Sequence, residues 1–341
     1  MSAQELDLVK LEPWLREKVP PFEGALSAEK FAGGQSNPTF KLTAGAQHYV
    51  LRRKPPGELL ASAHAVDREF RVLDALANTD VPVPKVVALC EDDSLIGSMF
   101  YVMEHLEGRI FWDPTVPEVG DDDRAAIYDE MNRVLAALHS VDVDAVGLSD
   151  YGKPGNYYAR QIGRWTKQYR ASETESVAEM EALIDWLPDN IPAGGETIAL
   201  VHGDYRIDNM IFHPTEPKII GILDWELSTL GDPLADLAYQ LMAWQFPREG
   251  GMVGLEGVDR APLLIPSDEA YIESYCQRTG RADIDHWPFY MAFCFFRIAA
   301  ILQGIKKRAL IGTASSAEAD SRAVMVGPLA ALGAGYIKQS A

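Results

Sequence analysis

The sequence predicts an α+β protein of two lobes, with a strand-rich lobe over residues 1–105 and a helix-rich lobe over residues 106–341. Three observations support this prediction. Strand-like segments dominate roughly the first hundred residues. Apolar residues recur at helical spacing through most of the remainder. A polar loop flanked by strand-like residues interrupts these helices near residues 200–225. We expect the two lobes to join at about residues 104–108, where a strand runs into a glycine turn.

The N-terminal lobe is expected to be rich in strands, with a turn-rich stretch at 31–42 that is flanked by strand-like residues. Pro20 and Pro21 end the first helix, and a proline–proline–glycine run breaks the strand HYVLRR. In chain order the elements are a helix at 11–18, a strand at 48–53, a helix at 64–77, and strands at 81–92 and 99–108.

The C-terminal lobe is expected to be built mainly from helices. Two strand-like pieces, TIALVHGD and KIIGILDWE, bracket its polar loop. Arg297 interrupts the longest apolar run, Phe289 to Leu302, which is too short to span a membrane and reads as a buried helix. The helices are expected around 127–138, 157–170, 232–245, 268–279 and 287–309.

The composition limits the partners that the protein can have. Lys and Arg total 31 and Asp and Glu total 50, so the net charge is −19, and apolar residues make up 47% of the chain. A sizeable core is expected, and the acidic excess argues against nucleic acid and anionic membrane as partners. The three cysteines lack metal-binding spacing and the N-terminus lacks an apolar signal segment, so we expect a cytoplasmic protein. A small-molecule substrate is the expected partner, and the oligomeric state is left open.

The polar loop carries the residue types that phosphoryl transfer requires. Asp204 is followed after five residues by Asn209, and Asp224 ends the strand-like run after another fifteen. Phosphoryl transfer needs a carboxylate near the attacking hydroxyl, oxygen ligands for Mg²⁺ and cations over the phosphates. Asp204 is therefore a candidate base, and Asn209 and Asp224 are candidate metal ligands. A loop of polar residues that only hydrogen-bond one another is the alternative.

The run HGDYRIDN at 202–209, with the following GILDWE, resembles the motif of aminoglycoside phosphotransferases, choline kinases and, more distantly, protein kinases. The resemblance extends from residue 31 to about residue 310 and implies a protein-kinase-like two-lobe fold with ATP and Mg²⁺ as cofactors. It makes Asp204 the catalytic base, places Arg206 near the transferred phosphate, and makes Asn209 and Asp224 metal ligands. It gives His202 a bracing role.

The N-terminal lobe should then supply the nucleotide site. Arg52 stands where most kinases have a phosphate-gripping Lys, and strand alternation puts Arg52 and Arg53 on opposite faces. We assign Arg52 to the cleft, with Glu69 as its ion-pair partner, although Glu69 could instead be a surface charge. The glycine-containing loop at 33–37 would cover the phosphates of the nucleotide. The alternative is that this loop is an ordinary hairpin turn. Adenine would bind the backbone at the end of the last strand. The expected nucleotide-binding residues are Gly33, Gly34, Gln35, Ser36, Asn37, Arg52, Glu69, Glu104 and Leu106.

The acceptor is the least determined part of the prediction. The chain particularly resembles the phosphotransferase-like domain that is fused to some acyl-CoA dehydrogenases, on runs such as VLRRKPPG and FFRIAAILQGIKKRAL. Cations on the C-terminal helices favour an anionic acceptor over an aminoglycoside, although a solvated helix face is the alternative. The candidate acceptor-binding residues are Arg160, Arg164, Lys167, Arg297 and Lys307.

We therefore expect an ATP- and Mg²⁺-dependent kinase that phosphorylates a hydroxyl of a small molecule, with a hydroxyacyl-CoA-type acceptor as the candidate. An aminoglycoside antibiotic phosphotransferase and a catalytically silent nucleotide-binding scaffold are the alternatives. A protein kinase is disfavoured, because Gly231 and Asp232 follow Asp224 too closely to leave room for a peptide-docking segment.

Overall fold

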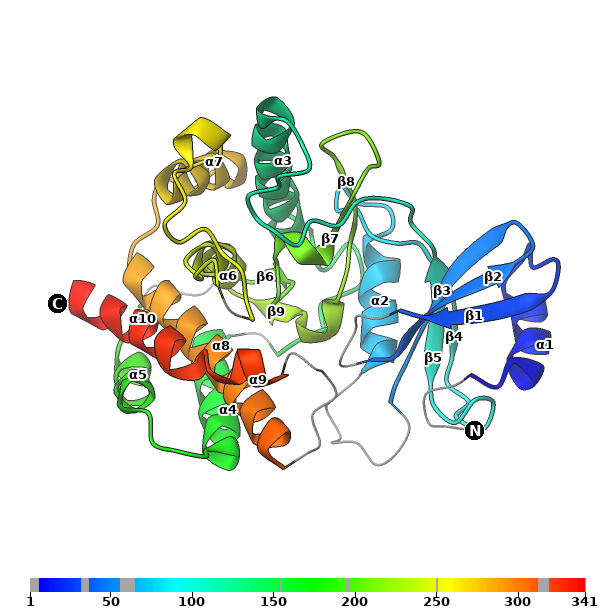
Figure 1. Ribbon diagram of the computed structural model, residues 1–341, viewed down its shortest axis with the longest axis horizontal. Coiled ribbons are helices and arrows are strands. Elements are labelled where there is room, and N and C mark those ends of the chain that lie inside the picture. The colour runs from blue at the N-terminus through cyan, green and yellow to red at the C-terminus, as the bar shows by residue number, and fades with distance from the viewer. Residues whose placement is uncertain are drawn as a thin grey trace.

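The structure is a computed structural model that describes residues 6–31, 37–55, 65–153, 155–193, 197–249, 251–311 and 319–340. Figure 1 shows a sheet-containing lobe at one end of the molecule and a helical lobe at the other. Helix α2 (Val66–Leu76) lies between the sheet and the helical lobe, and α1 (Leu8–Lys18) lies at the far end of the sheet. This arrangement confirms the α+β prediction.

The N-terminal sheet is antiparallel and has the strand order β1-β2-β3-β5-β4. On β3, Leu51 packs into the cluster that contains Leu11 and Leu15 of α1, whereas Val50 packs into the cluster on the α2 side. Because side chains alternate along a strand, Arg52 shares its face with Val50 and points toward α2. The strand bounds are β1 (Leu26–Lys30), β2 (Thr39–Ala44), β3 (Gln47–Arg53), β4 (Val86–Cys90) and β5 (Phe100–Glu104).

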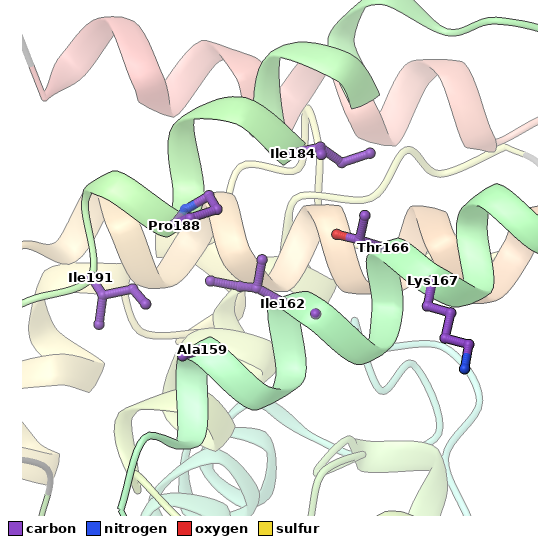
Figure 2. A pocket seen from close by; sticks show the side chains of 8 residues that line it. Ala159, Ile162, Thr166, Lys167, Ile184, Pro188 and Ile191 are labelled. Carbon is purple, nitrogen blue, oxygen red and sulfur yellow. The ribbon is translucent and has the colours of Figure 1, made fainter.

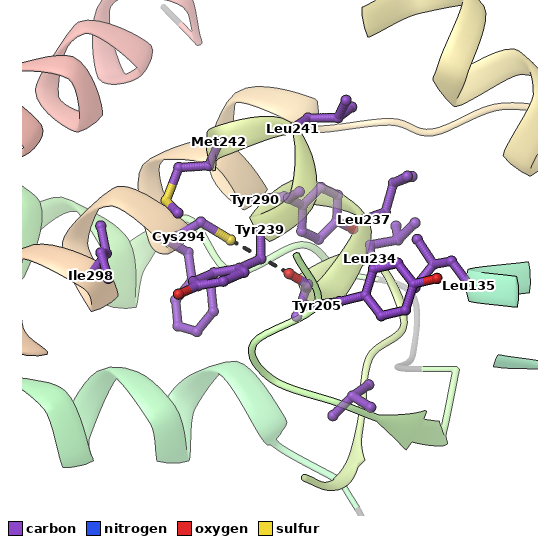
Figure 3. Close-up of a cluster of buried hydrophobic side chains, with 14 of the residues drawn as sticks. Leu135, Tyr205, Leu234, Leu237, Tyr239, Leu241, Met242, Tyr290, Cys294 and Ile298 are labelled. Atoms are coloured by element: carbon purple, nitrogen blue, oxygen red, sulfur yellow. Dashed lines mark hydrogen bonds between the residues drawn. The ribbon is translucent and has the colours of Figure 1, made fainter. Parts of the chain in front are cut away.

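The C-terminal lobe is organised around the long helix α8, which packs against α4, α5, α6, α9 and α10. This helix is long and apolar enough to cross a membrane by composition, but 83% of its most apolar window is buried inside the protein. Figure 3 shows apolar side chains of α6 and α8 facing each other, with Tyr205 beside them. The helices are α3 (Asp121–His139), α4 (Tyr157–Ser172), α5 (Ala178–Asp189), α6 (Leu234–Trp244), α7 (Asp268–Thr279), α8 (Trp287–Leu310), α9 (Ala319–Ala323) and α10 (Val326–Gln339).

The polar loop is held by four short strands, where the sequence suggested two. They form two antiparallel pairs, β6 with β9 and β7 with β8, and the polar loop runs from β6 to β7. A short helical turn at Ile207–Asn209 lies within the polar loop, and a second at Trp225–Leu227 overlaps the end of the strand-like piece KIIGILDWE. The bounds are β6 (Ala199–Val201), β7 (Met210–Phe212), β8 (Ile219–Ile222) and β9 (Thr229–Gly231).

Candidate active site

His202 ties the start of the polar loop to the segment before Asp224. Its Nε2 donates to the carbonyl oxygen of Leu223 at 2.9 Å, and its Nδ1 accepts from the backbone N–H of Asp204 at 3.1 Å. The ring is fully buried, and this pairing requires the neutral tautomer with its proton on Nε2. These are the contacts that a bracing residue needs.

Asp236, in the first turn of α6, fixes the backbone just before Asp204. Its buried carboxylate accepts the backbone N–H groups of His202 at 2.6 Å and Gly203 at 2.8 Å, and lies 3.3 Å from Nε2 of His139. Burial opposes the charge, but the bond from His139 and the backbone donors outweigh it and lower the pKa of Asp236. Gly203 has φ 84°, and a Cβ there would lie 2.8 Å from the carbonyl oxygen of Leu227. The turn therefore requires glycine.

Asp204 lies at the edge of the loop with its carboxylate partly exposed. The side-chain amide of Asn209 donates to its Oδ2 and to its backbone carbonyl oxygen, both at 2.9 Å. Nε of Arg206 lies 3.7 Å from its Oδ1, while the other end of that guanidinium bonds Asp208. Burial raises the pKa of Asp204, but Arg206, a hydrogen bond from Tyr239, and Asn209 lower it below its usual value. The carboxylate is thus ionised at neutral pH.

Asp224 is brought beside this loop by the chain that leaves β8. The backbone N–H of Leu223 donates to the carbonyl oxygen of Asn209 at 2.8 Å. Asp224 itself has left-handed backbone angles, φ 65° and ψ 59°, which are uncommon outside glycine and are characteristic of functional positions. Its side chain is 36% exposed and bonds Arg52 of the N-terminal lobe, so it lies where the two lobes meet.

Arg52 joins the N-terminal lobe to this group of residues. Its Nε lies 2.7 Å from Oε2 of Glu69 on α2, and its Nη2 lies 2.6 Å from Oδ1 of Asp224. The carboxylate of Glu226 is 4.0 Å from the same nitrogen. Burial opposes the charge of Arg52, but these carboxylates outweigh it and raise the pKa of Arg52. The expected ion pair with Glu69 is present, and a second bond links the phosphate-gripping position directly to a candidate metal ligand.

Glu69 is buried and has further donors around it. Asn37 donates from its side chain to Oε1 at 2.7 Å, and the hydroxyl of Tyr101 donates to Oε2 at 3.2 Å. Burial raises the pKa of Glu69, and Arg52 acts against this rise. The alternative that Glu69 is a surface charge is thus wrong, because its side chain is only 2% exposed.

The other expected nucleotide-binding residues fall into two groups. Glu104 ends β5, where its backbone N–H donates to the carbonyl oxygen of Lys85 and its carboxylate accepts from the backbone N–H of Lys85. Within the described chain, the backbone of Leu106 forms no hydrogen bond. An unpaired backbone at Leu106 is what an adenine-binding hinge requires. Gly33, Gly34, Gln35 and Ser36 lie outside the described residues.

The residues around Asp224 fit a magnesium ion. Within the described part of the chain there is no group of three or more His, Cys, Asp or Glu side chains arranged to hold a metal. Mg²⁺ does not need such a group, since it is usually bound by one or two protein oxygens with waters and substrate phosphates. Asp224 supplies a carboxylate. Asn209 supplies an amide oxygen, because its nitrogen is the atom that bonds Asp204.

Comparison with known proteins identifies the family. Residues 27–290 match the model of the phosphotransferase enzyme family APH. The chain belongs to the APH phosphotransferase family. A mouse protein, acyl-CoA dehydrogenase family member 10, is 50% identical over 310 residues, which cover 91% of this chain and 29% of the mouse protein. The chain thus spans less than a third of that relative's length.

Solved structures of APH phosphotransferases share the fold. A crystal structure from Ralstonia eutropha, provisionally described as an aminoglycoside phosphotransferase, is 53% identical with a TM-score of 0.88 and covers 98% of this chain and 99% of that chain. An aminoglycoside phosphotransferase solved with AMP-PNP and hygromycin B is 16% identical with a TM-score of 0.62, covering 96% and 98%. The latter likeness shows the fold alone and confirms the predicted kinase-like architecture.

The five candidate acceptor-binding cations of this family member lie in different environments. Arg297 is buried and donates to the carbonyl oxygen of Gly203, so it supports the catalytic loop. Two others donate hydrogen bonds to backbone carbonyl oxygens. Arg160 donates to that of Lys153 at 2.6 Å, and Lys307 donates to that of Ala171 at 2.7 Å. The remaining two, Arg164 and Lys167, are exposed on α4 without a hydrogen bond or ion pair to any described residue.

Sequence reasoning missed two residues that contact the catalytic segment. Tyr239 on α6 lies beside Asp204 and hydrogen-bonds it, and burial raises the pKa of its hydroxyl well above the usual value, so it stays a donor. His139 at the end of α3 supports Asp236. The position of Tyr239, three residues after Asp236 on one helix, was a usable signal. His139 offered none, because its partner is distant in the sequence.

Proposed function

We propose that this protein transfers the γ-phosphoryl group of Mg²⁺-bound ATP to a hydroxyl of a small anionic acceptor. The family assigns phosphotransferase chemistry. The observation that carries the finer proposal is the convergence of Asp204, Asn209, Asp224 and Arg52 where the two lobes meet.

Each of these residues has a separate task in the proposed reaction. Asp204, ionised and held by Asn209, accepts the proton of the acceptor hydroxyl as that oxygen attacks the γ-phosphorus. Arg206 lies next to Asp204 and supplies positive charge where the transferred group gathers negative charge. Asn209 and Asp224 hold magnesium, which when bound neutralises the phosphate oxygens. Arg52, positioned by Glu69, binds the phosphates that remain on the nucleotide.

The nucleotide donor is supported by the fold and by the hinge. The relative solved with AMP-PNP is a kinase with an ATP analogue bound, and this chain shares its architecture. The unpaired backbone of Leu106 lies at the junction of the lobes, where adenine would bind.

The acceptor is proposed to be a hydroxyacyl-CoA-type molecule. The relatives at 41–50% identity include acyl-CoA dehydrogenase family members 10 and 11. These proteins are much longer than the present chain, which covers 29% and 43% of their lengths. The exposed cation Arg164 on α4 suits an anionic acceptor better than a polycationic antibiotic.

A labelled-ATP assay tests the proposal. The purified protein is incubated with Mg²⁺ and [γ-³²P]ATP, with either hydroxyacyl-CoAs of several chain lengths or aminoglycosides such as kanamycin. We expect label in hydroxyacyl-CoA products and none in aminoglycosides. Label only in aminoglycosides would make it an antibiotic phosphotransferase. Binding of Mg²⁺–ATP without transfer to any hydroxyl would make it a silent nucleotide-binding protein.

A further inference from the structure

Arg164 is an exposed cation on α4 that contacts an aromatic ring. Its guanidinium lies 5.1 Å from the ring centroid of Trp165, and within the described residues it forms no hydrogen bond or ion pair. By contrast, Arg170 on the same helix makes a two-pronged bond to Glu181. An arginine left without an anion is notable in a chain with 50 acidic and 31 basic residues.

Arg164 lies next to the machinery that supports the catalytic loop. Arg297 of α8 places its guanidinium 5.7 Å from the same Trp165 ring and donates to the carbonyl oxygen of Gly203, the residue before Asp204. Trp165 is 4% exposed, so its position between the two helices is fixed by packing. Arg164 therefore lies near Arg297, the residue of α8 that contacts the loop before Asp204.

The charge around Arg164 favours an anion there. Desolvation by the neighbouring helices and the positive charge of Arg297 both lower the pKa of Arg164. Arg297 is occupied by a backbone carbonyl and is buried, so it cannot itself reach a ligand in solvent. A guanidinium with all its donors available matches the geometry of a carboxylate or a phosphate.

The hollow on the other flank of α4 is separate from this position. It has a volume of about 480 Å³ and lies between α4 and α5, lined by apolar side chains such as Ile162, Ile184 and Ile191. Figure 2 shows these side chains between the two helices, together with Lys167 of α4, which also lines the hollow. No residue of the catalytic loop lines it, so we leave it out of the acceptor site.

We propose that Arg164 binds an anionic group of the acceptor, a carboxylate or a phosphate, while the acceptor hydroxyl lies at Asp204. This rests on the proposed function for the place of the hydroxyl. Arg164 is then the residue that selects a negatively charged acceptor, and Trp165 holds its guanidinium in place by a cation–π contact.

The test compares Arg164→Gln with Arg164→Lys and with Arg170→Gln. Arg170→Gln removes the same charge from the same helix. Calorimetry measures how tightly three kinds of probe bind to the full chain in the presence of Mg²⁺ and AMP-PNP. They are hydroxyacyl-CoAs of several chain lengths, the matching free hydroxy acids, and the neutral N-acetylcysteamine thioesters.

We expect Arg164→Gln to weaken binding of the charged probe by roughly 10- to 100-fold, the range for loss of a charged hydrogen bond. Arg164→Lys should recover part of that loss, and Arg170→Gln should match the wild type. The neutral thioester should bind the wild type and Arg164→Gln equally. In turnover, KM for the acceptor should rise while kcat and KM for ATP stay unchanged.

The two anion sources give different results. A loss confined to the CoA esters identifies a phosphate, and a loss confined to the free acids identifies a carboxylate. Three outcomes would overturn the proposal. Wild type and Arg164→Gln could bind the charged probes equally, or Arg164→Gln and Arg170→Gln could lose affinity equally. The third outcome is that no charged probe binds. Binding that depends on Arg164 without phosphoryl transfer would instead overturn the proposed function and leave this assignment standing. Phosphoryl transfer whose acceptor KM is the same in wild type and Arg164→Gln would overturn the assignment of Arg164 and leave the proposed function standing.

Discussion

Asp204 is the residue on which the proposed chemistry depends most directly. Its carboxylate is held by Asn209 on one oxygen and faces Arg206 on the other, so it is both fixed and ionised. Because its pKa lies below the usual value, a change of pH near neutrality does not protonate it. The base is therefore ready without any prior proton transfer.

Asp204→Asn should abolish turnover while leaving nucleotide binding nearly intact. The amide keeps the shape but cannot accept the hydroxyl proton, and general-base catalysis contributes roughly 100- to 10,000-fold. We expect kcat to fall by about that range, with the Kd for Mg²⁺–ATP changed less than about threefold. Turnover is measured with labelled ATP and binding by calorimetry. Unaltered turnover would show that another group is the base.

Arg52 has two carboxylate partners, one from each lobe. The forked guanidinium reaches Glu69 and Asp224 at the same time, which the single ammonium of a Lys could not do with the same geometry. Arg52 thus holds one oxygen of Asp224, the candidate metal ligand. This explains how an Arg can stand where most kinases have Lys, and it predicts that metal and Arg52 compete for Asp224.

Arg52→Met should destabilise the protein more than Arg52→Lys. Methionine leaves Glu69 buried with only Asn37 and Tyr101 as donors, and removing one partner of a buried pair costs about 3–5 kcal/mol. Lysine keeps the charge and should cost markedly less. Urea unfolding at neutral pH measures both. A second measurement, Mn²⁺ binding by electron paramagnetic resonance, should show tighter binding to Arg52→Lys than to wild type, since Asp224 is freed. Equal stability of the two variants would mean that Glu69 does not need the charge.

At the scale of elements, the loop between β6 and β7 is positioned by helix α6. The first turn of α6 provides Asp236, which bonds two consecutive backbone N–H groups, and its next turn provides Tyr239, which contacts Asp204. Figure 3 shows Tyr239 on α6 beside Cys294 of α8, so the same helix is anchored in the core. Helix packing thereby sets the position of the base.

Asp236→Asn should lower the free energy of unfolding by an amount that depends on pH. The folded-state pKa of Asp236 is lowered, so its carboxylate contributes stability above the ordinary pKa of Asp, and this contribution is lost as the pH falls through the lowered folded-state value. We expect a loss of about 1–3 kcal/mol at pH 7 from the unpaired backbone donors. Urea unfolding measured from pH 7 downward should show the difference from wild type shrinking below about pH 4. A difference that does not change with pH would show that the charge of Asp236 is not what stabilises the loop.

At the scale of the whole molecule, the two lobes meet at a short connection that crosses β7. The backbone of Arg109 pairs with that of Phe212 in both directions at 2.8 Å, so the connection is bonded to the strand that follows the catalytic loop. A Cβ at Gly108 would lie 2.3 Å from the carbonyl oxygen of Phe212 and 2.4 Å from Ile211. Only glycine allows so close an approach between the hinge and the catalytic lobe.

Gly108→Ala should therefore disturb both stability and nucleotide binding. The added methyl group must push the hinge away from β7, and overpacking of this kind costs about 1–3 kcal/mol. Because adenine is proposed to bind at Leu106, KM for ATP should rise as well. Gly335→Ala in α10 is the control, since nothing lies within 4 Å of its Cβ, and it should be neutral or slightly stabilising. Thermal unfolding and ATP kinetics measure both effects. If the two variants behave alike, the hinge contact is unimportant.

Much of the fold and of the site follows from patterns that are local in the chain. The α+β class, the strand that carries Arg52 and the helices at 268–279 and 287–310 are visible as periodicity. Helices α5 and α10 were not predicted. In α10, glycine and alanine replace the larger apolar residues that mark a helix face. The strand-like pieces TIALVHGD and KIIGILDWE hold β6 and β8, whereas β7 and β9 lie outside them and are only three residues long, too short to show a strand period.

The proposed chemistry can be read from the sequence alone, because Asp204 and Asn209 are five residues apart on one loop and have the residue types that phosphoryl transfer needs. Tertiary structure decided which charges are available. Arg52 and Asp224 are 172 positions apart, and no local pattern could reveal that they share a bond. Among the five basic side chains expected at the acceptor, packing buries Arg297 and backbone carbonyls engage Arg160 and Lys307. A cation's role depends on what lies around it in space, and only the folded chain leaves Arg164 exposed to an anionic ligand.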